Sequence, residues 1–328
     1  MSPAKHKQLA PVQPFLRWAG GKRWLARLIA PKISEFINSS GGCYFEPFLG
    51  GGAMFFAVAP SKAHLSDNNA DLISTFCLVR NRYHEIQELV RNIAVSAENY
   101  YKLRATTDAE DIFHAARFIF LNRTCYGGIH RTNQSGQFNV PYGGGSRTPE
   151  NLWKRGILER AALLLQRSKT SIECCDFAKS INRARRGDVV YCDPTYQGVT
   201  RAQFDRYGSE IFCWADQERL AECASQAAER GALVIISNGA SKEIRKVFSA
   251  TNKIALEKKK TIGRPPRSNE VHREMLYVYS PKATRVVFTS ANGPRESPLK
   301  TVQRRTNVRT VTRVRRATRS FMRAESCI

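Results

Sequence analysis

The fold of this chain is read most directly from Asp188-Val189-Val190-Tyr191-Cys192-Asp193-Pro194-Thr195-Tyr196. The β-branched apolar run that begins at Val189 predicts a buried strand of a parallel sheet. Because proline cannot continue a strand ladder, the chain turns at Asp193-Pro194. In open α/β sheets, ligands bind at the carboxyl ends of the strands. The sequence therefore predicts a ligand site at this turn.

The turn combines an acid, a proline and an aromatic ring. The carboxylate of Asp193 and the carbonyl of Pro194 are acceptors only, so together they can hold an exocyclic amino group. Tyr196 offers a flat ring on which a base can stack. The alternative is an ordinary strand-to-loop turn in which Asp193 caps a helix, and the rest of the chain decides between the two.

Composition narrows the class of protein. The chain has 328 residues, 42% of them hydrophobic, which suffices for one large α/β domain with an insertion or for two domains. Lys+Arg 52 against Asp+Glu 28 gives a net charge of +24, which favours nucleic acid as the partner. The sequence contains no apolar run long enough to span a membrane and no C-x-x-C pair, so we expect neither a membrane segment nor a bound metal.

A glycine-rich turn follows an earlier strand, in Cys43-Tyr44-Phe45-Glu46-Pro47-Phe48-Leu49-Gly50-Gly51-Gly52-Ala53-Met54. This pattern predicts the first strand, turn and helix of a doubly wound fold. The G-x-G-x-x-G spacing is missing, so a dinucleotide is not favoured. About twenty residues beyond the strand, Asp67 ends a second predicted strand, where an acid commonly holds ribose hydroxyls. The combination indicates a cofactor that contains a nucleoside.

Upstream of these elements, Phe15-Leu16-Arg17-Trp18-Ala19-Gly20-Gly21-Lys22 precedes a predicted helix that starts at Arg23. The spacing is not that of a Walker phosphate loop. Trp18 and Lys22 suit an aromatic cofactor that carries a carboxylate. The alternative is a turn with a tryptophan in the core.

The middle of the chain predicts an insertion into the sheet. Residues 72–122 show helical periodicity and lack glycine, and residues 151–167 form a further amphipathic helix. Between them, residues 122–143 are rich in Gly, Asn, Gln and Arg, and Ser135-Gly136 predicts a hairpin. A hairpin that carries Arg131 has groups that read base edges in a major groove. The alternative is a solvated loop.

The last third of the chain predicts further sheet elements and a tail. We expect a strand at residues 173–177, a helix at 216–230, a strand at 232–238, a basic loop at 258–267 and a final strand at 274–279. From Lys282 onward there are 12 Lys/Arg and two acids, with no periodicity. Such a segment does not fold alone, so it is expected to be a disordered arm that binds phosphates. Removing its charge of +10 from the total of +24 leaves +14 on residues 1–281.

Five of these stretches, in unbroken order, resemble the Dam-type DNA adenine-N6 methyltransferases. Residues 15–22 look like that family's F-L-[KR]-W-A-G-G-K, and residues 45–52 look like its cofactor loop. Ser66-Asp67-Asn68-Asn69-Ala70-Asp71-Leu72-Ile73 is similar to its D-x-N-x-D-L-I. Residues 122–143 look like its recognition hairpin, and Asp193-Pro194-Thr195-Tyr196 lies where the family has D-P-P-Y.

The resemblance implies an α/β fold: a doubly wound, Rossmann-like methyltransferase sheet with an inserted, mainly helical target-recognition domain that carries a β-hairpin. The catalytic domain would comprise residues 15–73 and 168–281, and the insertion residues 74–167 with the hairpin at 122–143. Residues 1–14 would form a flexible arm, and residues 282–328 lie outside the resemblance as a basic tail. The reaction would be methyl transfer from S-adenosylmethionine to N6 of adenine in double-stranded DNA.

The resemblance also assigns roles to residues. Asp193, Pro194 and Tyr196 would be catalytic. The cofactor would be bound by Trp18, Lys22, Phe45, Glu46, Pro47, Gly50, Asp67, Asp176 and Phe177. DNA would be contacted by Arg17, Tyr126, Ile129, Arg131 and Asn133. The family often targets GATC, needs no metal, and is encoded by bacteria and phages. A cytoplasmic, DNA-associated protein is therefore expected, with a monomer as the default.

Three positions depart from the family pattern. A second DNA-reading arginine of the family falls on Gly144 or Gly145, and the asparagine after the hairpin tyrosine is Gly127. Both differences indicate a relaxed or shifted recognition site. Thr195 replaces the second proline of D-P-P-Y, which restores an N–H and loosens φ. Because both acceptors of the turn remain, we expect activity to be kept; a slower rate is one outcome that Thr195 allows.

Three other functions are alternatives to DNA adenine methylation. A catalytically impaired DNA-binding homologue would bind the cofactor without transferring a methyl group. A methyltransferase acting on RNA, or on an amide side chain, could use the same pair of acceptors. A purely architectural basic protein would leave the glycine turn and Asp67 without a purpose.

Overall fold

The computed structural model describes residues 12–18, 22–106, 110–133, 136–145, 152–153, 156–194, 212–259 and 271–281. Its centre is a seven-stranded sheet. The strands are β1 (Tyr44–Glu46), β2 (Lys62–Asp67), β3 (Lys169–Cys174), β4 (Val189–Cys192), β5 (Leu233–Asn238), β6 (Asn252–Lys259) and β7 (Val271–Tyr279). Their order is β3-β2-β1-β4-β5-β7-β6. The first five strands pair in parallel, and β7 runs antiparallel to both β5 and β6.

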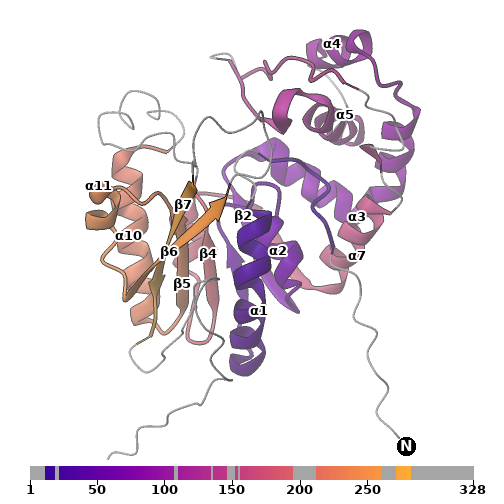
Figure 1. The fold of residues 1–328 in the computed structure, drawn as a ribbon. Coiled ribbons are helices and arrows are strands. Elements are labelled where there is room, and N and C mark those ends of the chain that lie inside the picture. Colours follow the sequence, from indigo (N-terminus) through magenta and orange to yellow (C-terminus); the bar gives the residue numbers. More distant parts are fainter. Residues whose placement is uncertain are drawn as a thin grey trace, which may run out of the picture. The chain divides into compact units, whose positions relative to one another are not determined.

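Helices pack on both faces of this sheet, as Figure 1 shows for α1 and α2 on one side and α10 and α11 on the other. The helices are α1 (Arg23–Ser40), α2 (Ala53–Val58), α3 (Ala70–Asn92), α4 (Ala97–Ala105), α5 (Asp111–Thr124), α7 (Ile157–Arg167), α8 (Phe177–Ile181), α10 (Trp214–Glu229) and α11 (Lys242–Val247), with a 3-10 turn η1 (Tyr126–Gly128). This is the mostly parallel, doubly wound α/β sheet that the sequence predicts.

The strand β4 is the centre of the sheet, as its apolar run predicts. Every residue of β4 is buried. Successive side chains of a strand point to opposite faces, so Tyr191 packs in the core beneath α1 and α2, while Val190 packs in the core beneath α10. On either side of β4 lie β1 and β5, and the order of the strands reverses between β1 and β4. Ligands of doubly wound sheets bind at such a reversal.

Two sequence predictions in the second half of the chain are wrong in position. The strand expected at residues 173–177 lies earlier, at Lys169–Cys174, and Asp176 caps α8. This strand is an edge of the sheet with mostly exposed or half-buried residues, so it has no apolar run to mark it. The basic loop expected from Lys258 overlaps β6, whose last two residues are Lys258 and Lys259. These lysines pair with β7.

The segment between β2 and β3 is helical over most of its described length. Helix α3 packs on both α5 and α7. After α5, antiparallel bridges join Cys125 to Tyr142 and Thr132 to Phe138, so the chain doubles back on itself between them. The first three residues of the range 122–143 belong to the end of α5.

The start of β1 fits tightly against the turn before β4, which gives a stability prediction. A Cβ atom on Gly42 would lie 2.0 Å from the carbonyl oxygen of Gly187, which is a backbone atom and cannot swing away. We expect Gly42→Ala to lower the free energy of unfolding by about 3 kcal/mol, measured by urea denaturation. Gly239→Ala is the control, because a Cβ there would meet nothing within 4 Å. Equal stability of the two variants would contradict this packing.

Candidate active site

Acidic residues gather where the parallel strands end. Glu46 is the last residue of β1, Asp67 the last of β2, and Asp193 follows β4 directly. The antiparallel strand β7 adds Glu274. Because β2, β1 and β4 are neighbours in the sheet, their ends share one edge.

A buried lysine connects the acid after β4 with the acid of β7. Lys22 caps the start of α1, and its Nζ lies 2.6 Å from Oε1 of Glu274 and 3.6 Å from Oδ1 of Asp193. Ser237 on β5 donates a further hydrogen bond of 2.8 Å to Glu274. Lys22 therefore holds two carboxylates, one of which is the predicted catalytic acid.

Glu274 was not predicted as a site residue. The signal was present in the sequence, because this acid begins the apolar run Met275-Leu276-Tyr277-Val278. A carboxylate buried within an apolar strand needs a charged or hydrogen-bonding partner. The identity of that partner, Lys22, could not be read from the sequence, because it lies more than two hundred residues earlier in the chain.

The pKa of Asp193 is raised to about 7, mainly because burial disfavours the charged form. The ammonium of Lys22 opposes this shift, and the nearby charge of Glu274 adds to it. Only 23% of the Asp193 side chain is exposed. A carboxyl group that titrates near neutrality at a strand end is typical of a functional site.

The residues after Asp193 are described in part. Pro194 is buried directly after the acid, and the acid lies 3.6 Å from Nζ of Lys22. Thr195 and Tyr196 lie outside the described residues.

The glycine turn and Asp67 form one unit. Oδ2 of Asp67 accepts the backbone N–H of Gly50 at 2.9 Å, and Oδ1 accepts that of Asn69 at 3.1 Å. A further backbone hydrogen bond to this carboxylate comes from Asn68. An ionised carboxylate has about four acceptor positions, so these contacts leave about one position for a ligand hydroxyl. Burial raises the pKa of Asp67, and the hydrogen bonds from Gly50, Asn69 and Asn68 oppose that shift.

Trp18 packs against the same turn. A Cβ atom on Gly50 would lie 2.9 Å from Cδ1 of Trp18, and φ of Gly50 is +47°, so both the space and the backbone favour glycine here. On its other side Trp18 stacks on His130, with ring centroids 5.3 Å apart. The tryptophan thus lies between the glycine turn and the segment that follows η1.

Three further residues predicted to bind the cofactor are buried: Phe45, Glu46 and Pro47. Glu46 is buried and accepts hydrogen bonds from the Tyr44 hydroxyl at 2.8 Å and from the backbone N–H of Phe55 at 2.9 Å. Burial raises the pKa of Glu46 to about 8. Phe45 and Pro47 are buried on either side of it. These contacts join the end of β1 to the start of α2 and so fix the glycine turn.

Asp176 and Phe177 lie at the start of α8. Asp176 accepts two hydrogen bonds from Arg219 of α10, at 2.8 Å and 3.1 Å. The guanidinium of Arg219 lies 4.3 Å from the centre of the Phe177 ring, which stacks on Phe48 with centroids 5.3 Å apart. Arg219 could not be predicted as a site residue, because it is an exposed residue of the amphipathic helix α10.

The predicted DNA-contacting residues lie around η1. Tyr126 is 63% exposed and Ile129 is 37% exposed, both high values for large apolar side chains. Asn133 is exposed as well. Arg131 is exposed, and its Nε donates to Oδ1 of Asn139 at 2.7 Å.

Arg17 is tied to the same region through a residue that was not predicted. Asn122, at the end of α5, accepts the backbone N–H of Arg17 at 2.8 Å and donates to its carbonyl at 2.6 Å. A Cβ atom on Gly128 would lie 2.6 Å from Cβ of Arg17. Arg17 therefore lies beside η1, with its side chain exposed.

Two further observations concern the described part of the chain. Its helices include none with the length and apolar character needed to cross a membrane. Its His, Cys, Asp and Glu side chains form no group of three or more that could hold a metal ion.

The architecture is that of a Rossmann-like enzyme: a doubly wound sheet has a glycine turn after its first strand, an acid at the end of the second and a lysine-paired acid after the fourth. The family model of D12 class N6 adenine-specific DNA methyltransferases matches residues 18–262. The chain therefore belongs to this family of adenine-specific DNA methyltransferases, as the five motifs predict.

Individual relatives agree with this assignment. The chain is 33% identical over 261 residues to the type II methyltransferase M1.LlaDCHI of Lactococcus lactis subsp. cremoris, covering 77% of this chain and 90% of that protein. It is 32% identical over 277 residues to the DNA adenine methylase of Escherichia coli strain K12, covering 81% and 95%. It is 34% identical over 247 residues to the type II methyltransferase M.MjaIII of Methanocaldococcus jannaschii, covering 69% and 84%.

Proposed function

We propose that this enzyme methylates N6 of adenine in duplex DNA at the turn Asp193-Pro194, with S-adenosylmethionine as the methyl donor. The observation that carries the proposal is the placement of Asp193, which follows β4 at the edge where Asp67 ends β2 and where Lys22 reaches it across 3.6 Å. Family membership supports the reaction, and the acceptor pair supports the residues that perform it.

The chemistry of this turn suits an amino group. The carboxylate of Asp193 and the carbonyl of Pro194 would each accept a hydrogen bond from the N6 amino group, which would draw that nitrogen away from amide-like planarity and aim its lone pair at the methyl group. As the nitrogen–carbon bond forms, the bond from the methyl carbon to sulfur breaks, and the proton that N6 loses would leave through the carboxylate of Asp193. The adenine reaches them by flipping out of the duplex, as chemistry on a paired base requires. Tyr196 stacks on the flipped base. Positioning and electrostatics supply the catalysis.

The residues present fit a nucleoside-type cofactor. Asp67 retains about one acceptor position for a ribose hydroxyl, while its other lone pairs accept from the backbone of Gly50, Asn69 and Asn68. Trp18 packs on this turn and Lys22 lies beside Asp193. S-adenosylmethionine supplies a methyl group on a positively charged sulfur. Phe45, Glu46 and Pro47 hold the glycine turn in place, and Asp176 with Phe177 forms the neighbouring wall of the proposed cofactor site.

The chain divides into functional parts as follows. Residues 15–73 and 168–281 form the catalytic domain, and residues 74–167 form a target-recognition insertion that carries the hairpin at 122–143. The exposure of Tyr126 and Ile129 supports insertion of these side chains into DNA. Arg131, Asn133 and Arg17 then contact bases and phosphates at a GATC-like site. Residues 282–328 form a basic arm that holds DNA nonspecifically.

A substrate panel tests this function. The full-length protein is incubated with labelled S-adenosylmethionine and, separately, with unmethylated duplex DNA, RNA or a protein mixture. We expect label in DNA alone. Label in RNA or protein would favour the rival methyltransferases, and cofactor binding without label in any substrate would indicate an impaired homologue. We expect the enzyme to act as a monomer, which sedimentation in the same buffer tests.

The pKa of Asp193 gives a prediction about pH. As a carboxylate Asp193 has acceptors only, whereas protonation places a donor on the group that must accept from N6. Burial raises the pKa of Asp193 to about 7. The value of kcat/KM should therefore fall as pH decreases through about 7 and reach a plateau above it. Lys22→Gln removes the charge that opposes the upward shift, so the acid limb should move to higher pH.

Lys22→Arg is the matched variant, because it retains the positive charge. It should keep the acid limb near that of the unmodified enzyme, and thermal unfolding checks that both variants fold. An acid limb that is identical in Lys22→Gln and Lys22→Arg would contradict the role of Asp193 as the titrating acceptor.

A further inference from the structure

A second cluster of polar side chains lies on β2 and β3, away from the catalytic edge. Lys62 and Lys169 begin the two strands and are partners in the parallel register, and His64 and Ser171 are partners two residues further on. Residues two apart in a strand share one face. Asp67 ends β2, so the lysines lie about 16 Å from it at the strand rise per residue. The cluster is therefore separate from the proposed cofactor site.

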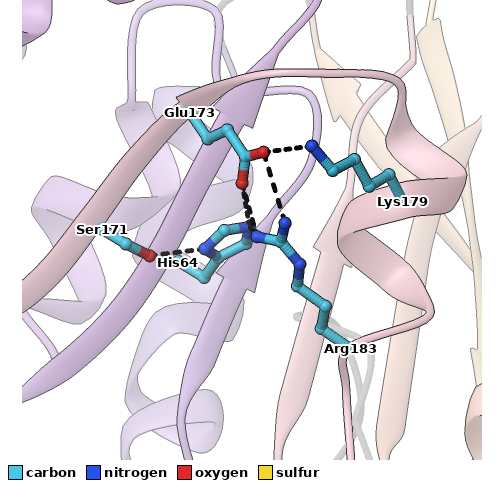
Figure 2. A network of polar contacts seen from close by, with 5 residues as sticks. All are labelled: His64, Ser171, Glu173, Lys179 and Arg183. Atoms are coloured by element: carbon cyan, nitrogen blue, oxygen red, sulfur yellow. Dashed lines mark hydrogen bonds and ion pairs between the residues drawn. The ribbon is translucent and has the colours of Figure 1, made fainter.

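Figure 2 shows a network of polar contacts within this cluster. Nδ1 of His64 lies 2.5 Å from Oγ of Ser171, and Nη1 of Arg183 lies 3.1 Å from Nε2 of His64. Arg183 and Lys179 both pair with Glu173, each at 2.5 Å. These two cations lower the pKa of Glu173 to about 2, so it is ionised and fully engaged.

The network fixes the tautomer of His64. A guanidinium has donors only, so Nε2 of His64 must accept from Arg183. Burial and then the charge of Arg183 lower the pKa of His64, and Glu173, 3.9 Å from Nε2, opposes that shift. An Nε2 that accepts from Arg183 leaves the proton of the imidazole on Nδ1. That proton is donated to Oγ of Ser171. The hydroxyl hydrogen of Ser171 is then available to a ligand.

The same tautomer excludes one reading of the cluster. Ser171, His64 and Glu173 are the residue types of a nucleophile, a base and an acid. However, Nδ1 of His64 faces Ser171 already protonated and cannot take the proton of the hydroxyl. A hydrolytic triad needs the opposite arrangement. The cluster is therefore suited to binding and not to nucleophilic catalysis.

A pocket of about 340 Å³ opens over this face. Its polar lining comes from Lys62, His64, Lys169, Ser171 and Arg183. Lys62 and Lys169 are exposed, and among the residues the structure describes neither forms an ion pair with an acid. Like charges directly opposite each other on neighbouring strands are destabilising. A bound anion between them would offset that repulsion.

We propose that this pocket binds a phosphate group, held by Lys62, Lys169 and the hydroxyl of Ser171. The guanidinium of Arg183 also lines the pocket, where its ion pair with Glu173 offsets its charge. The phosphate has two possible sources, the backbone of DNA and a free phosphate ion. Both present the same tetrahedral oxygens, and the experiment separates them.

The test compares two double variants with the same change of charge. Lys62→Gln/Lys169→Gln removes both lysines of the pocket, and Lys242→Gln/Lys246→Gln removes two exposed lysines of α11. Binding of inorganic phosphate to the full-length protein is measured by isothermal titration calorimetry at constant ionic strength. DNA affinity is measured from 50 to 200 mM salt. Ser171→Ala provides a variant without a change of charge.

For a free phosphate ion, the pocket variant should lose at least about tenfold in affinity, Ser171→Ala several-fold, and the α11 variant less than twofold. For a DNA phosphate, the slope of log K against log salt should become shallower by about 2 in the pocket variant only. Either result supports the site and identifies the source. Indistinguishable behaviour of the two double variants in both measurements would overturn the proposal.

Discussion

Asp193→Ala is expected to lower the rate of methyl transfer by about a thousandfold, which corresponds to about 4 kcal/mol of transition-state stabilisation. The substitution removes the carboxylate that accepts a hydrogen of the target amino group and leaves only the carbonyl of Pro194. It also removes a carboxyl group whose burial already raises its pKa to about 7, so the fold should not depend on it. Single-turnover assays with saturating DNA and S-adenosylmethionine measure the effect.

The control for Asp193→Ala is its affinity for DNA and for the cofactor. Lys22 keeps its 2.6 Å contact with Glu274 when Asp193 is absent, so the start of α1 should stay in place. Affinities for DNA and for the cofactor should change by less than about threefold, because phosphate contacts elsewhere dominate DNA affinity and Asp193 is proposed to contact the target amino group and not the cofactor. Near-normal turnover of Asp193→Ala would sink the assignment of the catalytic turn.

Asp67→Ala is expected to weaken binding of S-adenosylmethionine about a hundredfold. The side chain accepts the N–H groups of Gly50, Asn69 and Asn68 and would offer its remaining acceptor position to a ribose hydroxyl. Hydrogen bonds to a charged group contribute about 1.5–3 kcal/mol each, so loss of the ligand contacts and of the ordered turn accounts for this effect. Calorimetric titration with S-adenosylmethionine measures it directly.

Asp188→Ala is the matched control for Asp67→Ala. Asp188 also accepts two backbone N–H groups, those of Cys43 and Arg185, both at 2.8 Å. It lies before β4, at the opposite end of the strand from Asp193. Both variants should lose similar stability, while cofactor affinity should fall only in Asp67→Ala. A comparable loss of affinity in Asp188→Ala would show that the effect is one of general stability.

Much of the sheet could be predicted, because its central strands are buried and therefore consist of continuous apolar residues. The apolar residues of β4 and β5 are buried on both faces, and their runs stand out in the sequence. The edge strand β3 carries polar residues and was placed several residues too late. Strand β6 has alternating polar residues and was not predicted at all.

The site could be predicted in its motifs but not in its pairings. Asp193, Asp67 and the glycine turn come from short local patterns, and they do lie at one edge of the sheet. The pairs of site residues that contact each other are distant in sequence. Glu274 pairs with Lys22, Arg219 pairs with Asp176, and Asn122 bonds the backbone of Arg17. Such contacts follow from the topology of the sheet and from packing, which no local spacing encodes.

The identity of the methylated product tests the proposed function most directly. Unmethylated duplex DNA is treated with the enzyme and S-adenosylmethionine, digested to nucleosides and analysed by mass spectrometry, with Asp193→Ala in parallel. We predict N6-methyladenine in the sample treated with the unmodified enzyme, and only background with the variant. A methylated cytosine as the sole product, or equal N6-methyladenine in both samples, would contradict the account.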